Sequence, residues 1–124
     1  MTKEELNTSL DEISIQVDLD FDISVPITIM EKIQRLTNMI GLSAECYAWS
    51  EKFYNDKLGG LILAKEYKSL SATDKKILFG SLASNEIMVM SKAERLNKGI
   101  IHGIDGLRSL LSYLKEEYRQ TQNG

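Results

Sequence analysis

The feature that most constrains this fold is an alternation of apolar and polar residues between positions 13 and 25. The apolar members are Ile13, Ile15, Val17, Leu19, Phe21, Ile23 and Val25. Successive side chains of a strand point to opposite faces, so this spacing gives one apolar and one polar face. The pattern predicts a β-strand or an extended arm over 13–25. The alternative is a helix or loop that alternates by chance.

A single strand constrains assembly because its backbone N–H and C=O groups need partners. No second segment alternates convincingly, and a lone strand is not stable in water. The partner strand would come from a second copy, paired antiparallel about a two-fold axis, or from the sheet edge of another protein. The sequence therefore predicts a homo-oligomer whose interface includes the first five apolar positions, Ile13, Ile15, Val17, Leu19 and Phe21.

The flanking segments carry helix signals. Thr2 and Glu5 have the spacing of a capping box, which predicts a short helix over about 3–12. Pro26 suits the first turn of the next helix, because its missing N–H has no intrahelical partner there. Gly41 stands where a helix C-cap would use a left-handed residue.

Another helix is expected to begin near Ser43 and to run to about Leu70. Gly59 and Gly60 mark either a turn or a weak point inside it. Ser71 or Thr73 then suits the N-cap of the next helix.

The C-terminal segment has no proline from Asp74 to Gln120 and carries an apolar seam with the α-helical period. The seam is Leu78, Leu82, Asn85, Val89, Ala93, Leu96, Ile100, Ile104, Leu107, Leu111, Leu114 and Tyr118. One helix of this length would span roughly 70 Å, whereas a compact chain of this size has a radius of gyration of about 14 Å. The helix therefore breaks, with a bend expected near His102–Gly103, or packs on other chains through Leu96, Ile100, Ile104 and Leu107.

These signals together predict a mainly α fold. We expect a helical hairpin or bundle with a long C-terminal helix and one N-terminal β-strand or extended arm. Residues 1–25 would form an acidic N-terminal helix plus the arm, with a net charge of −6, and residues 26–124 a helical domain with a net charge of +3. Asn85 is polar on the apolar seam, where it would either fix the register of buried helices or mark contact with solvent.

Catalytic signatures are missing from the sequence. His102 and Asp105 could share a helix face, but no nucleophile completes the pair. The acidic residues of the alternating segment lack the glycine and distal glutamate of a calcium loop, and Cys46 has no cysteine to pair with. No phosphate-binding loop or zinc spacing occurs. We expect no enzyme activity, no metal and no cofactor. Without a signal peptide or a membrane span, a cytoplasmic location is expected, in a cell or a virus-infected host.

A basic stripe offers a second kind of partner. Lys92, Arg95, Lys98 and His102 fall within about 120° on a helical wheel and could hold a nucleic-acid backbone. Aromatic residues that could stack on bases are Tyr47, Trp49, Phe53 and Tyr54. The alternatives are a solvated helix face for the stripe and core packing for the aromatic residues.

The layout resembles that of small phage recombination mediators. The shared elements are a helical pair, the junction Leu70–Lys76, and a long terminal helix ending near Gly106–Arg108. No residue-level motif accompanies this layout, so the resemblance is one of architecture. It implies ring-forming proteins that help to load a recombinase on single-stranded DNA.

The sequence thus favours a non-enzymatic oligomeric helical protein that acts through protein–protein interaction, as an adaptor or an inhibitor. Phage-encoded inhibitors of bacterial defence are of similar size and also lack an active site. The alternative is a single-stranded nucleic-acid-binding accessory factor of the recombination-mediator type. Expected partners are the chain itself, an unidentified protein and, under the alternative, nucleic acid; no membrane is expected.

Overall fold

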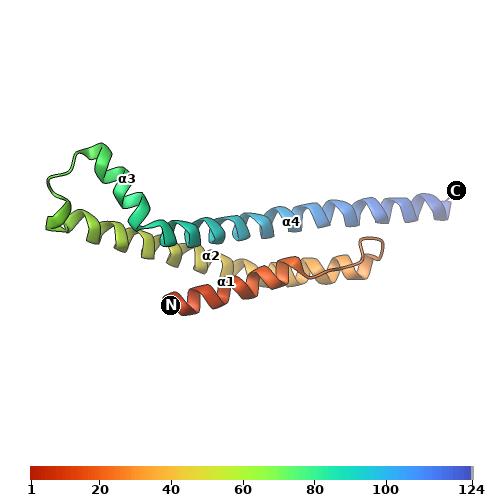
Figure 1. The fold of residues 1–124 in the computed structure, drawn as a ribbon. Helices are drawn as coiled ribbons and strands as arrows, with labels where there is room; N and C mark the ends of the chain where they lie inside the picture. Colours follow the sequence, from red (N-terminus) through yellow and green to blue (C-terminus); the bar gives the residue numbers. More distant parts are fainter. Residues whose placement is uncertain (124) are drawn as a thin grey trace.

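The computed structural model describes residues 1–123 and shows a rod of helices (Figure 1). The elements are α1 (Lys3–Asp18), α2 (Pro26–Leu63), a short 3-10 helix η1 (Lys65–Tyr67), α3 (Ala72–Leu82) and α4 (Ser84–Asn123). Within these residues no strand occurs, and no helix is long and apolar enough to cross a membrane. The prediction of a mainly α fold with a long C-terminal helix is confirmed.

The two long helices, α2 and α4, form an antiparallel hairpin. Asn97 of α4 donates a hydrogen bond from Nδ2 to Oγ of Ser43 on α2 at 3.2 Å, and Ser43 is buried. Further along the hairpin, the backbone of Gly103 approaches Leu36, and a Cβ at Gly103 would lie 3.4 Å from Cδ1 of Leu36. These contacts set the register of the hairpin.

Helix α1 lies along the middle of this hairpin, where it completes the core (Figure 1). Three of its residues, Leu6, Leu10 and Ile13, recur at helical spacing and are buried. The core cluster consists of Leu6, Leu10, Ile13, Leu36, Cys46, Ala93, Ile100 and Ile104. An ion pair of 2.9 Å between Asp11 and Lys92 also joins α1 to α4.

The predicted N-terminal strand is not present in the described residues. The segment from Ile13 to Asp18 continues α1, so the side chains that a strand would place on one face diverge: Ile13 is 0% exposed and Ile15 is 61% exposed. The helical spacing of Leu6, Leu10 and Ile13 outweighs the alternation. A helix also satisfies its backbone hydrogen bonds internally, which removes the need for a partner strand.

Helix α1 ends against a buried lysine of α2. Lys32 is 3% exposed, and its Nζ donates to the carbonyl oxygens of Gln16 at 2.8 Å, Val17 at 2.7 Å and Leu19 at 2.8 Å. Since the last carbonyls of a helix have no intrahelical partner, one ammonium with three N–H bonds satisfies all three groups. A cation near a helix C-terminus is also favoured by the helix dipole.

The surroundings of Lys32 set its protonation equilibrium. Burial lowers the pKa of Lys32 below its ordinary value, and the nearby charge of Arg35 acts in the same direction. The charges of Asp18 and Asp20 oppose this pKa shift. The ring of Phe21 lies 5.8 Å from Nζ, so the α1–α2 connection folds over the amine.

Residues 19–25 connect α1 to α2 through a turn built on Asp22. Its Oδ1 accepts hydrogen bonds from the backbone N–H of Ser24 at 2.9 Å and from the Ser24 hydroxyl at 2.6 Å. These bonds lower the pKa of Asp22, because they stabilise the carboxylate. Pro26 then occupies the first turn of α2, as predicted.

The long helices pass through positions where interruptions were expected. Gly41 lies inside α2 and is no C-cap, and Gly59–Gly60 also lie within it. A helical glycine costs about 1 kcal/mol relative to alanine, whereas burying one leucine or isoleucine contributes about 1.5–3 kcal/mol. Packing along the hairpin therefore keeps α2 continuous.

The break in the C-terminal segment falls at Ala83 and not near His102–Gly103. Ala83 is buried, and its N–H bonds to the carbonyl of Phe79. The bend turns α3 away from the axis of α4, which lets Phe79 pack edge-on against Tyr67 with ring centroids 5.7 Å apart (Figure 1). The Oγ of Ser71 accepts the N–H of Asp74 and caps α3, which confirms one of its two predicted N-caps.

We expect Lys32→Met to destabilise the protein by about 3 kcal/mol. The substitution removes three charge-assisted hydrogen bonds and leaves part-buried carbonyls without a donor, while it also removes the cost of burying the ammonium. Urea unfolding followed by circular dichroism measures this change. The matched control is Lys52→Met, since Lys52 is exposed and forms only an i,i+4 ion pair with Asp56. A loss no larger than that of the control would contradict the capping role.

Gly99→Ala should raise the free energy of unfolding by about 0.5–1 kcal/mol, because Gly99 is helical and nothing lies within 4 Å of an added Cβ. Gly103→Ala should gain less, since its new methyl group meets Leu36. Thermal unfolding of both variants tests this order. Destabilisation by Gly99→Ala would show that α4 is interrupted there.

Candidate functional site

The residues predicted to form an oligomer interface divide into two groups in the structure. Ile13, Ile100 and Ile104 are buried in the core of the same chain. Val17, Leu96 and Leu107 pack against that core, whereas Ile15, Leu19 and Phe21 retain accessible surface. Most of the predicted set therefore joins α1, α2 and α4 of one chain, and the accessible part lies toward the α1–α2 connection.

The four residues of the basic stripe lie on α4, but two of them are paired with acids. Lys92 contacts Asp11 at 2.9 Å, and Lys98 contacts Glu94 at 2.8 Å. Arg95 and His102 are exposed on the same helix. These pairs reduce the positive charge that the stripe presents to solvent.

The aromatic residues considered for base stacking lie on α2. Tyr47, Trp49 and Phe53 pack against the core cluster, and the Trp49 and Phe53 rings lie 5.7 Å apart at a tilt of 34°. Tyr54 is half-buried. These aromatic residues therefore pack as part of the core and do not form an open platform on which bases could stack.

Groups with catalytic potential do not converge. Cys46 is buried, and burial followed by the charge of Glu45 raises the pKa of its thiol, while a hydrogen bond with Ser9 opposes the shift. His102 is exposed on α4. Across residues 1–123, no three His, Cys, Asp or Glu side chains gather as a metal ion would require.

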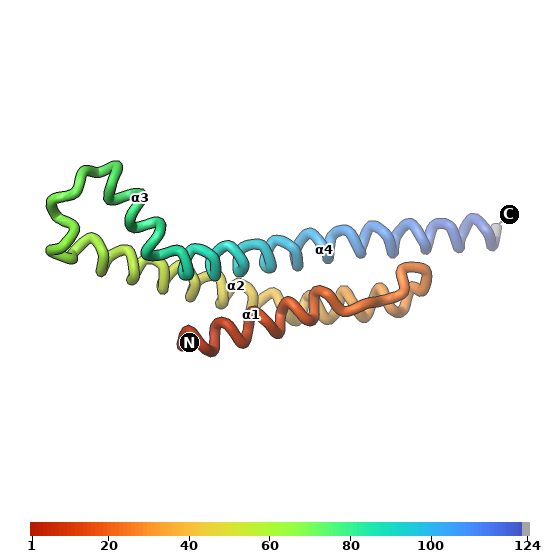
Figure 2. The backbone as a smooth tube through the Cα atoms, in the orientation of Figure 1, coloured from red at the N-terminus to blue at the C-terminus, as the bar shows by residue number. Residues whose placement is uncertain are grey.

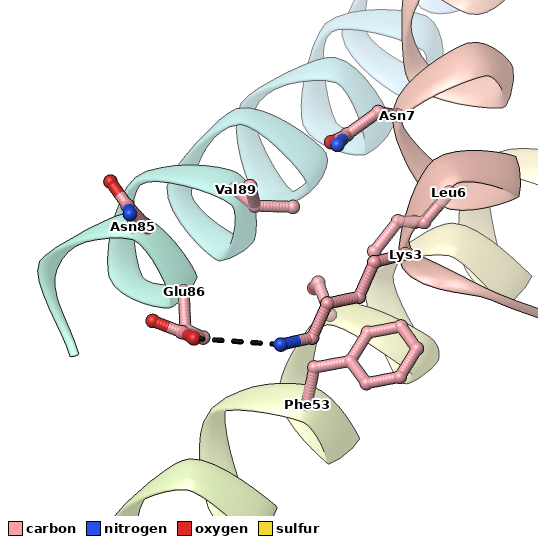
Figure 3. A pocket seen from close by; sticks show the side chains of 8 residues that line it. Lys3, Leu6, Asn7, Phe53, Asn85, Glu86 and Val89 are labelled. Atoms are coloured by element: carbon pink, nitrogen blue, oxygen red, sulfur yellow. Dashed lines mark ion pairs between the residues drawn. The ribbon is translucent and has the colours of Figure 1, made fainter.

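One hollow opens between the N-terminus of α1, the middle of α2 and the start of α4 (Figure 3). It is lined by Lys3, Leu6, Asn7, Ser50, Phe53, Asn85, Glu86 and Val89 and has a volume of about 210 Å³. The Nζ of Lys3 lies 3.8 Å from Glu86 and 5.9 Å from the Phe53 ring centroid (Figure 3). Binding pockets for small molecules are usually about 300–1,000 Å³, and this hollow is smaller, with its charged groups engaged with each other.

Asn85, the polar residue of the apolar seam, is exposed at the edge of this hollow. It therefore marks where the seam meets solvent. The polar contact that joins the two long helices is instead that between Asn97 and Ser43.

The most distinctive surfaces are the two ends of the rod. One end, here named the basic tip, comprises residues 57–82: the end of α2, η1 and α3, which Figure 2 shows as a turned-back path. Its charged residues are Lys57, Lys65, Lys68, Lys75, Lys76, Glu66 and Asp74, a net charge of +3. Leu63 and Ile77 are 79% and 69% exposed there.

Toward the opposite end lies the connection between α1 and α2, here named the acidic turn, which comprises residues 18–28. It lies beside the C-terminal half of α4, which extends past it (Figure 2). Its charged residues are Asp18, Asp20 and Asp22, a net charge of −3. Ile23 and Ile27 are 63% and 57% exposed there. Both ends thus combine exposed aliphatic side chains with a single dominant sign of charge.

The charges at both ends form no close ion pair among the residues that the structure describes. Over residues 1–123, no ion pair within 4.0 Å involves any lysine of the basic tip or any aspartate of the acidic turn. Residues 29–56 of α2 lie between the two ends and separate them by about 42 Å. At physiological salt the screening length is about 8 Å, so the two ends do not neutralise each other within one molecule.

No protein-family model, curated protein or solved structure matches this chain.

The basic tip was missed at the level of sequence because its lysines are spread over 20 residues and follow no helical stripe. A net charge of +3 was assigned to residues 26–124 as a whole. A charge count in shorter windows would have located it in 57–82, but the bend at Ala83 that brings α3 to this end needed the structure.

Proposed function

We propose that this chain is a non-enzymatic helical protein that acts by binding other protein molecules, including copies of itself, as an adaptor or an inhibitor. The observation that carries this proposal is the surface that the rod leaves uncovered. The accessible surface is 8356 Å² for 14.0 kDa, whereas a compact monomer of this mass exposes about 6,700 Å². The excess is comparable to the area buried in a standard protein–protein interface, about 1,600 Å².

The composition of this surface supports the same proposal. Large aliphatic side chains are exposed at both ends of the rod, including Leu63, Ile77, Ile23 and Ile27. Exposed apolar groups beside charged residues are typical of protein–protein interaction sites. The single buried thiol suits a reducing compartment, and we place the protein in the cytoplasm of a cell or of a virus-infected host.

Self-association should be visible as a mass above 14.0 kDa that rises with protein concentration. Static light scattering after size exclusion, over about a hundredfold range of concentration, measures it. Urea unfolding should also become more difficult at higher concentration, because association stabilises the folded chain. A constant monomer mass over the whole range would overturn the self-association part of the proposal.

A second candidate function is single-stranded nucleic-acid binding, favoured by the exposure of Arg95 and His102 on one helix. It predicts salt-dependent binding of labelled single-stranded DNA that Arg95→Glu with Lys98→Glu weakens by about tenfold or more. Fluorescence anisotropy at low and high salt measures this binding. The same charge change at the basic tip, Lys65→Glu with Lys68→Glu, is the matched control. Binding that only the tip variant weakens would contradict a role for the stripe.

A further inference from the structure

We infer that copies of this chain associate end to end, with the basic tip of one copy docked on the acidic turn of the next. The inference rests on the self-association proposed above and names the two surfaces that meet. It follows from the charge, the exposed side chains and the spacing of the two ends.

Charge complementarity selects a second copy as the occupant of each end. The basic tip has a net charge of +3 and the acidic turn a net charge of −3. No residue of the described chain forms an ion pair with these charges. The buried ammonium of Lys32 interacts with Asp18 and Asp20 at longer range, so each end presents most of its charge to a partner. Two like ends would repel, so tip-to-tip and turn-to-turn contacts are disfavoured.

Exposed aliphatic side chains at both ends supply the apolar part of the interface. On the basic tip these are Ile62, Leu63, Ile77 and Leu82, and on the acidic turn Leu19, Ile23, Val25 and Ile27. Complementary charges steer association and fix orientation, whereas burial of apolar area supplies most of the affinity. The paired ends provide both components.

The local structure keeps the acidic turn in a fixed shape before binding. The hydrogen bonds from Ser24 to Asp22 close the turn, and the bonds from Lys32 to the end of α1 anchor its first residues. The hydrogen bonds from Ser24 also lower the pKa of Asp22, because they stabilise its carboxylate. A preorganised surface loses less conformational entropy on binding than a flexible one.

The geometry determines the kind of assembly. The two surfaces differ and lie at opposite ends of the rod, so the contact is heterologous: each copy uses its tip for one neighbour and its turn for another (Figure 1). Repeating a heterologous contact closes a ring or extends a filament, depending on the rotation between copies. A two-fold dimer would instead place the same patch on both sides.

Two charge-reversed variants of the full chain test this inference. The tip variant carries Lys65→Glu, Lys68→Glu and Lys76→Glu, and the turn variant carries Asp18→Lys and Asp20→Lys. All five positions are exposed. Asp22 is retained because it closes the turn. Each variant alone places like charges at both ends, so we expect its dissociation constant to rise about tenfold or more.

An equimolar mixture of the two variants is the decisive measurement. The reversed tip of one variant then faces the reversed turn of the other, and the two unaltered ends also match. We expect the mixture to recover the mass of the unmodified protein in sedimentation velocity. A two-fold assembly that pairs like ends, tip on tip or turn on turn, would not show this recovery.

Two control variants, a folding check and a salt series accompany the mixture. Arg95→Glu with Lys98→Glu, and Glu12→Lys with Asp105→Lys, make similar charge changes at exposed positions away from both ends and should leave association unchanged. Circular dichroism verifies that each variant is folded. If the turn variant is not folded, Asp18→Asn with Asp20→Asn replaces it and should weaken association of the full chain. Raising the salt from about 0.15 M to about 1 M shortens the screening length from about 8 Å to about 3 Å and should also weaken association.

The possible failures separate the two proposals. A monomer at every concentration overturns both. An oligomer that neither variant disturbs overturns the end-to-end contact and leaves self-association in place. If the tip variant loses binding to single-stranded DNA or to vesicles with anionic lipid while the oligomer mass stays constant, the tip serves that ligand, and the inference is wrong.

Discussion

The ammonium of Lys32 lies where α1, the α1–α2 connection and α2 meet, and it donates to three carbonyl oxygens of the chain that precedes it. This contact ends α1 at a fixed point, and it directs the connection back over α2. Without it, two terminal carbonyls of α1 and one of the connection would lack a side-chain donor in a part-buried site. The position of α1 on the hairpin, and hence the buried positions of Leu10 and Ile13, depends on this anchor.

The placement of α1 also determines the shape of the molecule. α1 has 16 residues, whereas α2 and α4 have 38 and 40, so it covers only the middle of the hairpin. Both ends of the rod are left with less cover than the middle, and this explains why aliphatic side chains remain exposed there. A chain that buries its middle and leaves apolar side chains exposed at its ends is suited to contacts between molecules. Both the proposed function and the proposed end-to-end contact depend on these exposed side chains.

The two open ends of the rod carry opposite net charge. Near the middle of the rod, charged side chains pair locally, as in Asp11–Lys92 and Glu94–Lys98. Within the described residues, the lysines of the basic tip and the aspartates of the acidic turn form no ion pair, and the two groups carry opposite signs. Exposed ion pairs contribute little to stability, about 0–1 kcal/mol each. The unpaired groups therefore reduce folding stability little, while they give the molecule a polarity that a partner can recognise.

The helical elements that could be predicted from the amino-acid sequence are those with local signals: the cap at Thr2, the start of α2 at Pro26, the cap at Ser71 and the apolar seam of α4. Each of these signals depends on neighbouring residues or on a repeat along one helix. It can therefore be recognised without knowing which distant segments of the chain meet. The composition and spacing contain no familiar catalytic motif.

Three features depend on packing between distant segments and became apparent only in the folded chain. They are the helix at 13–18, the continuity of the helices through Gly41 and Gly103, and the position of the bend in the C-terminal segment. Those outcomes depend on residues far apart in the chain. Lys32 caps a helix that ends 13 to 16 residues earlier, and Leu36 packs against Gly103 from the other arm of the hairpin. The alternation of residues 13–25 is a local pattern, and burial of Ile13 against α2 and α4 outweighed it, because the free energy of core packing exceeds local propensity and is set by which distant segments meet.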